Sequence, residues 1–306
     1  MRFIGLSQWS LGLVAGLALT SGCSIRQAAV GGLTSFLGDA GSVFASERDP
    51  RLVEDSLPFT LKMLEAVLLQ DPQNETALLN LATGYTQYAY AFVETRARRL
   101  EETDIFAADV ERARARLFYD RARDYAFQYL DARRPGFSEL ALGDPESAVA
   151  SLGEGEASGL YWATLSWAAS IGMSLDDPIA LVDLPVVETF VERALALSSE
   201  EGLGDLYTFL VTFAAADPSG DEAALEKAES YFKLAVEATQ GQQAGPYVAL
   251  ATAVCVPRQN RERFEELLNT ATAVDVDSVP ETRLANVLAI REAERLLANA
   301  DQYFWR

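Results

Sequence analysis

Apolar residues recur at three- and four-residue intervals in nearly every segment from Pro50 onward, and this helical spacing is the strongest constraint on the fold. No stretch alternates apolar and polar residues in the way that a half-buried strand does. Turn-forming Pro, Gly, Asp and Asn residues separate the periodic segments. The sequence therefore predicts an all-α protein, with helices over residues 50–70, 75–102, 105–132, 156–172, 185–198, 203–215, 221–239, 246–254, 259–274 and 280–303.

Short helices joined by short polar breaks fit a stack of helical hairpins, and part of the chain carries the spacing of one. Leu78, Leu81, Ala82 and Tyr85 take the large, apolar, small and aromatic positions of the first helix of a tetratricopeptide repeat. Residues 228–235 match the second helix in the same partial way. We therefore predict a tetratricopeptide-like solenoid with irregular repeats and an internal channel. Since no repeat is complete, a non-repeating helical bundle is the alternative.

The N-terminus carries the pattern of a bacterial lipoprotein signal. A short apolar run leads through small residues to Cys23, and this run is too short to span a bilayer. We expect cleavage before Cys23 and acylation of its thiol with palmitate-type chains, which would anchor the mature protein without a spanning helix. Ser24 favours the inner leaflet of the outer membrane, facing the periplasm. A plain secretory signal with an incidental cysteine is the alternative. The predicted organisation is a signal peptide at 1–22, a tether with a short helix at 23–49 and the helical domain at 50–306.

Charge and composition exclude several classes of function. The net charge of −20 opposes binding to nucleic acid and to anionic lipid, so the lipid anchor is the expected link to the membrane. The chain has no histidine, which rules out catalytic triads and metal sites that need one. We expect no cofactor, no metal and no enzymatic activity. A hydrolase built on two carboxylates is the enzymatic alternative, but no such pair can be located from the sequence.

Two groups of aromatic residues are candidates for lining a channel. Tyr85, Tyr88 and Phe92 recur at helical spacing in one predicted helix, and Tyr161 and Trp162 begin another. In a solenoid the first helix of each pair lines the inner side, where Tyr and Trp offer apolar area with a polar tip. Ordinary core packing is the alternative for each of them.

Arginines are concentrated between residues 96 and 134, where ten of them lie among eight acidic residues. A guanidinium facing a cavity would hold a ligand carboxylate, and we select Arg116 and Arg123 for this role. The near balance of charges also fits ion pairs on solvated helix faces, which is the alternative.

Several longer strings occur in an ordered set along the chain: Ser24-Ile25-Arg26, Asp49-Pro50-Arg51-Leu52-Val53, Tyr88-Ala89-Tyr90-Ala91-Phe92-Val93, Arg134-Pro135-Gly136-Phe137, Leu160-Tyr161-Trp162, Pro246-Tyr247-Val248 and Gln259-Asn260. This set resembles the T component of tripartite ATP-independent periplasmic (TRAP) transporters, a lipoprotein family often called TatT.

The resemblance implies an all-helical, non-enzymatic periplasmic subunit that pairs with the solute-binding P component. It also implies a homotrimer whose protomers each contain a channel for an apolar or amphipathic carboxylate. The expected function is to bind such a ligand and to pass it to or from the P component. A helical-repeat lipoprotein that acts as a scaffold for envelope complexes is the alternative.

Overall fold

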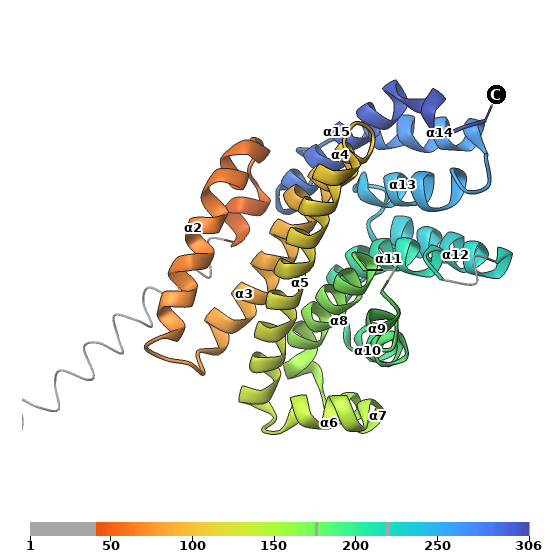
Figure 1. The fold of residues 1–306 in the computed structure, drawn as a ribbon. Helices are drawn as coiled ribbons and strands as arrows, with labels where there is room; N and C mark the ends of the chain where they lie inside the picture. The colour runs from red at the N-terminus through yellow and green to blue at the C-terminus, as the bar shows by residue number, and fades with distance from the viewer. Residues whose placement is uncertain (1–40, 175–176, 218–220, 306) are drawn as a thin grey trace, which may run out of the picture.

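The protein is helical throughout the part described by its computed structural model, which covers residues 41–174, 177–217 and 221–305 (Figure 1). Within these ranges α-, π- and 3-10 helices are present and no strand occurs, which confirms the predicted all-α class. The predicted signal peptide, Cys23 and most of the predicted tether lie outside the described residues. None of the described helices has both the length and the apolar composition needed to cross a membrane.

The helices follow the predicted order closely. The first part of the chain forms α2 (Pro50–Leu68), α3 (Glu75–Tyr88), the π-helix η1 (Ala89–Glu94), α4 (Thr95–Glu101), α5 (Ile105–Arg133), α6 (Phe137–Gly143), α7 (Pro145–Ala150), the 3-10 helix η2 (Glu154–Glu156) and α8 (Ala157–Gly172). The second part forms α9 (Pro178–Leu181), α10 (Leu184–Leu197), α11 (Glu200–Ala215), α12 (Glu222–Ala238), α13 (Gly245–Leu250), the π-helix η3 (Ala251–Cys255), α14 (Arg261–Thr272), the 3-10 helix η4 (Pro280–Thr282), α15 (Arg283–Ala298) and the 3-10 helix η5 (Ala300–Gln302).

Side-chain caps explain why several helices begin at the positions that the turn-forming residues in the sequence predicted. Asn74 accepts a hydrogen bond from the backbone N–H of Ala77 at 3.0 Å and thereby starts α3. Asp104 starts α5 in the same way. Such caps satisfy backbone donors that lack a partner in the first turn and stabilise a helix by about 1 kcal/mol each.

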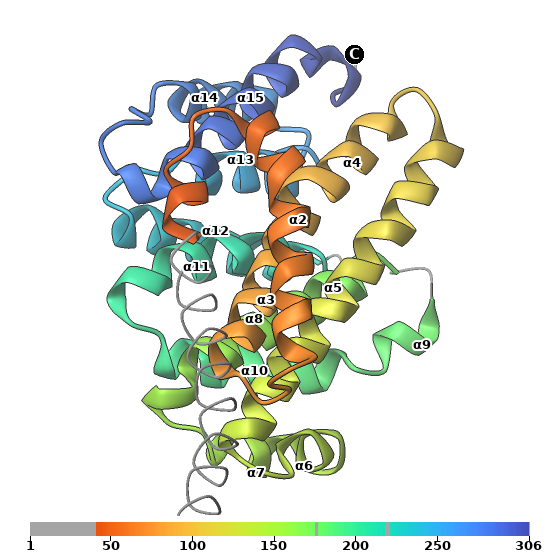
Figure 2. The same ribbon diagram turned by 90° about the vertical axis from the view of Figure 1, so that its left-hand side faces the viewer.

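The core consists of three successive clusters along the chain. The first joins α2, α3 and α5, the second joins α5, α8, α10 and α11, and the third joins α11 to α15. The 29-residue helix α5 links the first two clusters and extends along the molecule (Figures 1 and 2). Gly159 of α8 allows close packing on α5, because a Cβ at this position would lie 2.4 Å from the ring of Tyr129.

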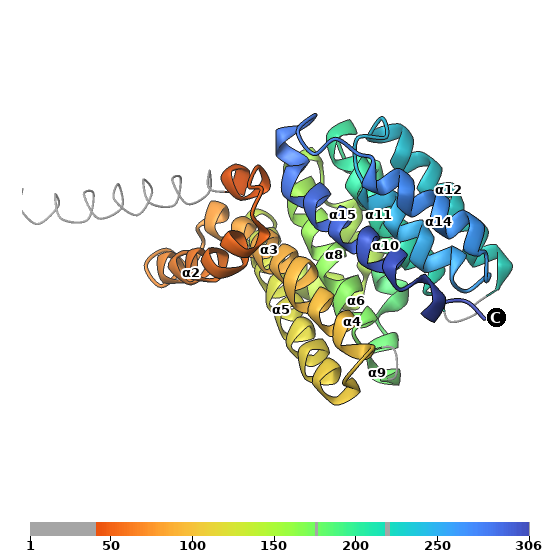
Figure 3. The same cartoon turned by 90° about the horizontal axis from the view of Figure 1, so that it is seen from above.

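The C-terminal helices contact α4 and the residue that follows it. Arg99 of α4 forms an ion pair with Glu292 of α15 at 3.6 Å. Glu102, which follows α4, accepts hydrogen bonds from Arg295 and from the hydroxyl of Tyr303, the latter at 2.8 Å. Figure 1 shows α15 next to α4, and Figure 3 shows α15 passing over α8 and α11 when viewed from above. The C-terminal helices are therefore attached to α4 and the residues that follow it.

Two segments differ from the sequence-based boundaries. The predicted helix at 75–102 is continuous, but it changes from α to π geometry at η1 and back again at α4. No helix was predicted between residues 132 and 156, and this region contains α6 and α7. Buried Phe137 and Val149 attach these short helices to the second cluster.

Cys255 lies in the third cluster and is free, with only 1% of its surface exposed. Burial raises the pKa of its thiol to about 11. The side chain therefore remains a neutral thiol and acts as a small apolar group in the core.

Candidate functional site

The first predicted aromatic group is packed in the core. Tyr85, Tyr88 and Phe92 are only 3%, 6% and 7% exposed. Phe118 of α5 packs against both tyrosines, with its ring centroid 5.7 Å from each of theirs. The hydroxyl of Tyr85 donates to Glu65 Oε1 at 2.5 Å. These rings hold α3 against its neighbours, and their role in lining a channel stays a prediction.

The second predicted aromatic group is more open. Tyr161 and Trp162 are half-buried near the start of α8. Their rings meet edge to face, with centroids 4.9 Å apart. This contact restrains the orientation of both rings while part of each remains accessible to solvent.

The two predicted arginines take part in charge contacts within the protein. Arg116 forms an ion pair with Asp177 at 3.8 Å. Arg123 pairs with Asp124 at 3.3 Å and lies over the ring of Trp167, 5.7 Å from its centroid. Both guanidinium groups thus have local partners, as the ion-pair alternative expects, and their role as clamps for a ligand stays a prediction.

Tyr90 is a residue that the sequence did not single out. It is 59% exposed, although it follows the buried Tyr88 by only two positions. It lies in η1, where the wider π-helical turn shifts the register relative to α3. The hydroxyl of Thr95 donates to the backbone oxygen of Tyr90 at 3.0 Å. Two positions correspond to about 200° around a helix, so Tyr90 lies on the face opposite the stripe that packs in the core.

A charged network adjoins the Tyr90 ring. The central guanidinium carbon of Arg98 lies 5.7 Å from the ring centroid, which is within range of a cation–π contact. Arg98 Nη1 donates to Glu94 Oε1 at 2.7 Å. The other oxygen of Glu94 accepts from the hydroxyl of the fully buried Tyr119. Glu94 therefore links the partly exposed guanidinium of Arg98 to the buried hydroxyl of Tyr119.

Tyr90 is accessible to water and also surrounded by protein. Desolvation is the largest of the effects that raise the pKa of its phenol, and charges on several helices act on it as well. These charges belong to Arg98 of α4, Asp205 of α11 and Glu292 of α15. From this combination we infer that Tyr90 faces a concave part of the molecule. We call the space bordered by Tyr90, Arg98, Tyr161 and Asp205 the inner recess.

Asp205 and Tyr161 lie within electrostatic range of each other. Asp205 is exposed by surface area, but desolvation raises the pKa of its carboxyl, and a hydrogen bond from Gln243 offsets this in part. Desolvation also raises the pKa of Tyr161, and the negative charge of Asp205 adds to that rise. Among the described residues, no ion pair reaches Asp205 and no cluster of His, Cys, Asp or Glu is suited to a metal ion.

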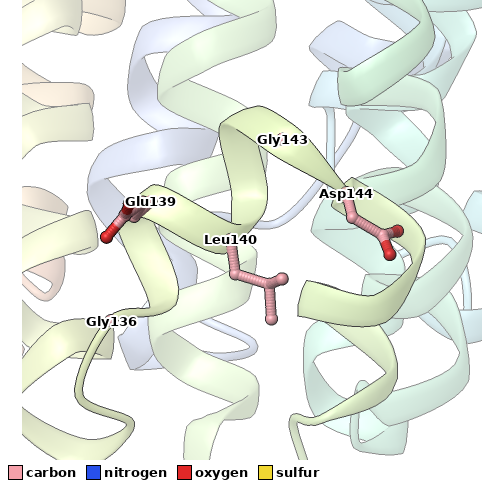
Figure 4. A pocket seen from close by; sticks show the side chains of 5 residues that line it. All are labelled: Gly136, Glu139, Leu140, Gly143 and Asp144. Atoms are coloured by element: carbon pink, nitrogen blue, oxygen red, sulfur yellow. The ribbon is translucent and has the colours of Figure 1, made fainter.

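A second depression lies on the outside of the molecule around α6 (Figure 4). Gly136, Glu139, Leu140, Gly143 and Asp144 line it. Asp144 already caps α7, since its carboxylate accepts from the backbone N–H of Ser147 at 3.0 Å and from the hydroxyl of Ser147 at 2.6 Å. In Figure 4 the Glu139 side chain points away from Leu140 and Asp144. The lining of this depression includes none of the four residues that define the inner recess, and the carboxylate of Asp144 is already used as a helix cap.

The sequence selected one of the four residues that define the inner recess. Tyr161 was among the predicted residues, whereas Tyr90, Arg98 and Asp205 were not. The available signal for Tyr90 was its helical position, because it lies outside the apolar stripe of its own helix. No comparable signal distinguishes Asp205 from the other acidic residues.

The fold and the recess define a class of protein: an all-helical chain whose terminal helices close on each other beside a partly polar inner space. Comparison with known sequences makes the assignment specific. The chain belongs to the TRAP transporter T-component family, whose sequence pattern matches residues 46–304. This membership places it among the accessory components of TRAP transport systems.

A relative with similarity along almost the whole chain supports the assignment. An uncharacterized protein of Treponema pallidum (strain Nichols) is 30% identical over 313 aligned positions, which cover 95% of this chain and 95% of the relative. The similarity therefore extends through all the helices that border the inner recess.

Proposed function

We propose that this protein is a lipid-anchored, periplasm-facing subunit that holds a small apolar or amphipathic molecule in the inner recess and exchanges it with the solute-binding P component of a TRAP transporter. Family membership supports the transport role. The observation that supports binding is Tyr90, a large aromatic residue that is 59% exposed and yet desolvated by surrounding helices. Aromatic surface of this kind binds apolar groups, and nearby polar groups orient them. The function requires no covalent chemistry.

Native mass spectrometry of the protein purified from its own cell envelope tests ligand binding. We expect an additional mass that is lost on denaturation. Tyr90→Ala should reduce its occupancy, because this change removes aromatic surface from the recess. Phe59→Ala is the matched control, since Phe59 is 71% exposed and lies on α2, a helix that does not border the inner recess. Equal occupancy in both variants would contradict a binding role for the recess.

Partner binding is tested by mixing the protein with the solute-binding protein of the same transporter. Sedimentation velocity should show a complex, and the protein alone should sediment as the homotrimer that the family resemblance implies. A protein that stays monomeric and binds envelope peptides instead of the solute-binding protein would favour the scaffold alternative.

The lipid anchor depends on Cys23. Acylation of Cys23 places the protein in the detergent phase of a phase-separation assay, and Cys23→Ala should move it to the aqueous phase. The expected location is the inner leaflet of the outer membrane, which fractionation of the two membranes would test.

A further inference from the structure

We propose that the outer face of α2, defined by Leu52, Phe59 and Ala66, rests on the surface of the lipid bilayer that holds the acylated Cys23. This inference rests on the proposed lipid anchor and adds the orientation of the protein on its membrane. The anchor limits the distance from the bilayer, and the outer face of α2 determines which side of the molecule meets it.

The first step is an apolar face of α2 that no described helix covers. Val53 and Leu57 are buried in the first cluster. On the other side of the helix, Leu52 and Phe59 are 55% and 71% exposed, and Ala66 is exposed as well. Seven positions separate each of these three residues from the next, so they form one stripe along the helix. Figure 2 shows α2 at the front of the molecule with no other described helix over its outer side.

The second step is the position at which the tether joins the fold. Gly41 is the first described residue and lies next to α2 (Figures 1 and 2). Phe44 packs against the first cluster, to which α2 belongs. Arg283 Nη1 of α15 donates to the backbone oxygen of Ser46 at 2.8 Å. The fold therefore holds the end of the tether at a defined place beside α2.

The third step is the reach of the tether. Residues 24–40 connect Cys23 to Gly41, and this connection spans at most about 60 Å when it is fully extended. Any less extended path brings α2 closer to the bilayer. At such short range the effective concentration of lipid surface is high, so a contact too weak to recruit free protein becomes occupied. Partial burial of Leu52 and Phe59 provides an apolar contact of this kind.

The fourth step is the charge of α2. The net charge of −20 for the whole chain opposes contact with anionic lipid. In α2, however, two basic residues nearly balance three acidic ones. Glu54 pairs with Arg96, and Glu65 pairs with Lys62 at 2.6 Å. A surface of zwitterionic lipid would therefore not repel this helix.

A second apolar stripe provides the comparison. On α5, Phe106 and Val110 are 81% and 67% exposed, and Ala113 is exposed as well. Figures 2 and 3 show the beginning of α5 on a different side of the molecule from residues 41–45. The proposed orientation therefore predicts contact with lipid at α2 and none at α5.

A nitrobenzoxadiazole label at two matched positions tests this orientation. Ala66→Cys and Ala113→Cys each lie seven positions after an exposed phenylalanine, and a brief labelling reaction leaves the buried Cys255 unmodified. The acylated protein is bound to vesicles of phosphatidylethanolamine and phosphatidylcholine that contain a spin-labelled lipid as quencher. We expect a blue shift and a loss of fluorescence for the label at position 66 and neither for the label at position 113.

The double variant Leu52→Ser/Phe59→Ser should remove both signals at position 66, while the protein still floats with the vesicles through its anchor. Quenching at position 113 instead, equal quenching at both positions or none at either would overturn the proposed orientation. A blue shift at position 66 in Cys23→Ala without vesicles would also overturn it and assign the face to a second copy of the chain. Failure of the protein to float with vesicles would count against the proposed lipid anchor, and the inference would fall with it. Circular dichroism of each variant establishes that it is folded.

Discussion

The guanidinium of Arg98 lies over the ring of Tyr90, with its central carbon 5.7 Å from the ring centroid. The same guanidinium is held by Glu94, so its charge is neutralised within the protein. Desolvation is the largest single effect on Arg98 and disfavours its charged form, but the charges of Glu94, Tyr90 and Glu292 together outweigh it, and the pKa of Arg98 is raised. An anionic ligand would have to compete with Glu94 for this cation.

Tyr119→Phe should destabilise the protein. The hydroxyl of Tyr119 is buried and donates to Glu94, so its removal leaves that carboxylate with one partner fewer. Hydrogen bonds to charged groups contribute roughly 1.5–3 kcal/mol, and we expect a loss of unfolding free energy in that range. Urea denaturation measures it. Tyr247→Phe is the control, since the Tyr247 hydroxyl makes no hydrogen bond within the described residues, and the prediction fails if both variants behave alike.

Gly159→Ala should also destabilise the protein. The new Cβ would lie 2.4 and 2.6 Å from ring atoms of Tyr129 and 3.0 Å from Leu130, so α8 and α5 would have to move apart. Overpacking of this kind costs about 1–3 kcal/mol, which exceeds the helix preference of Ala over Gly. Gly172→Ala in the same helix meets nothing within 4 Å and should be neutral or stabilising. Thermal unfolding of the two variants provides the comparison.

Asp205→Asn should change the pH dependence of stability in a defined direction. Desolvation raises the pKa of Asp205 in the folded protein, so folding favours its protonated form. The contribution of Asp205 to stability is therefore most favourable in acid and is lost as pH rises through the raised pKa. Relative to wild type, Asp205→Asn should gain stability on going from about pH 4 to neutral pH. A constant difference across urea titrations at several pH values would contradict the prediction.

Glu102→Gln should loosen the closure between the two ends of the chain with little effect on global stability. Glu102 accepts from both Arg295 and Tyr303, but it is exposed to solvent, where ion pairs contribute about 1 kcal/mol or less. Hydrogen exchange at the backbone amides of Gln302 and Tyr303 should accelerate. Asp109→Asn, which removes a pair within α5 only, should leave these amides unchanged.

Much of the fold could be predicted from the sequence because local signals determine it. The spacing of Leu78, Leu81 and Tyr85 and the caps at Asn74 and Asp104 define α3 and α5 without any knowledge of tertiary contacts. The short helices α6 and α7 were missed, because segments of six or seven residues are too short for a helical period to be recognised.

The inner recess was harder to predict, because its properties arise from helices that are distant in sequence. The spacing places Tyr90 outside the buried stripe of its helix, but which other helices surround it depends on the tertiary structure. Asp205 is desolvated because protein surrounds it in the folded state. The arginines Arg116 and Arg123 were selected by residue type alone, whereas their ion pairs depend on which acidic residues fold beside them.

The enclosed thiol of Cys255 provides a built-in reporter of motion in the C-terminal helices. An alkylating reagent reaches a side chain that is 1% exposed only during transient opening of α13 and α14. The rate of alkylation therefore reports the frequency of such openings in the unmodified protein, and a ligand that suppresses them would be detected as a slower reaction at a site it never touches.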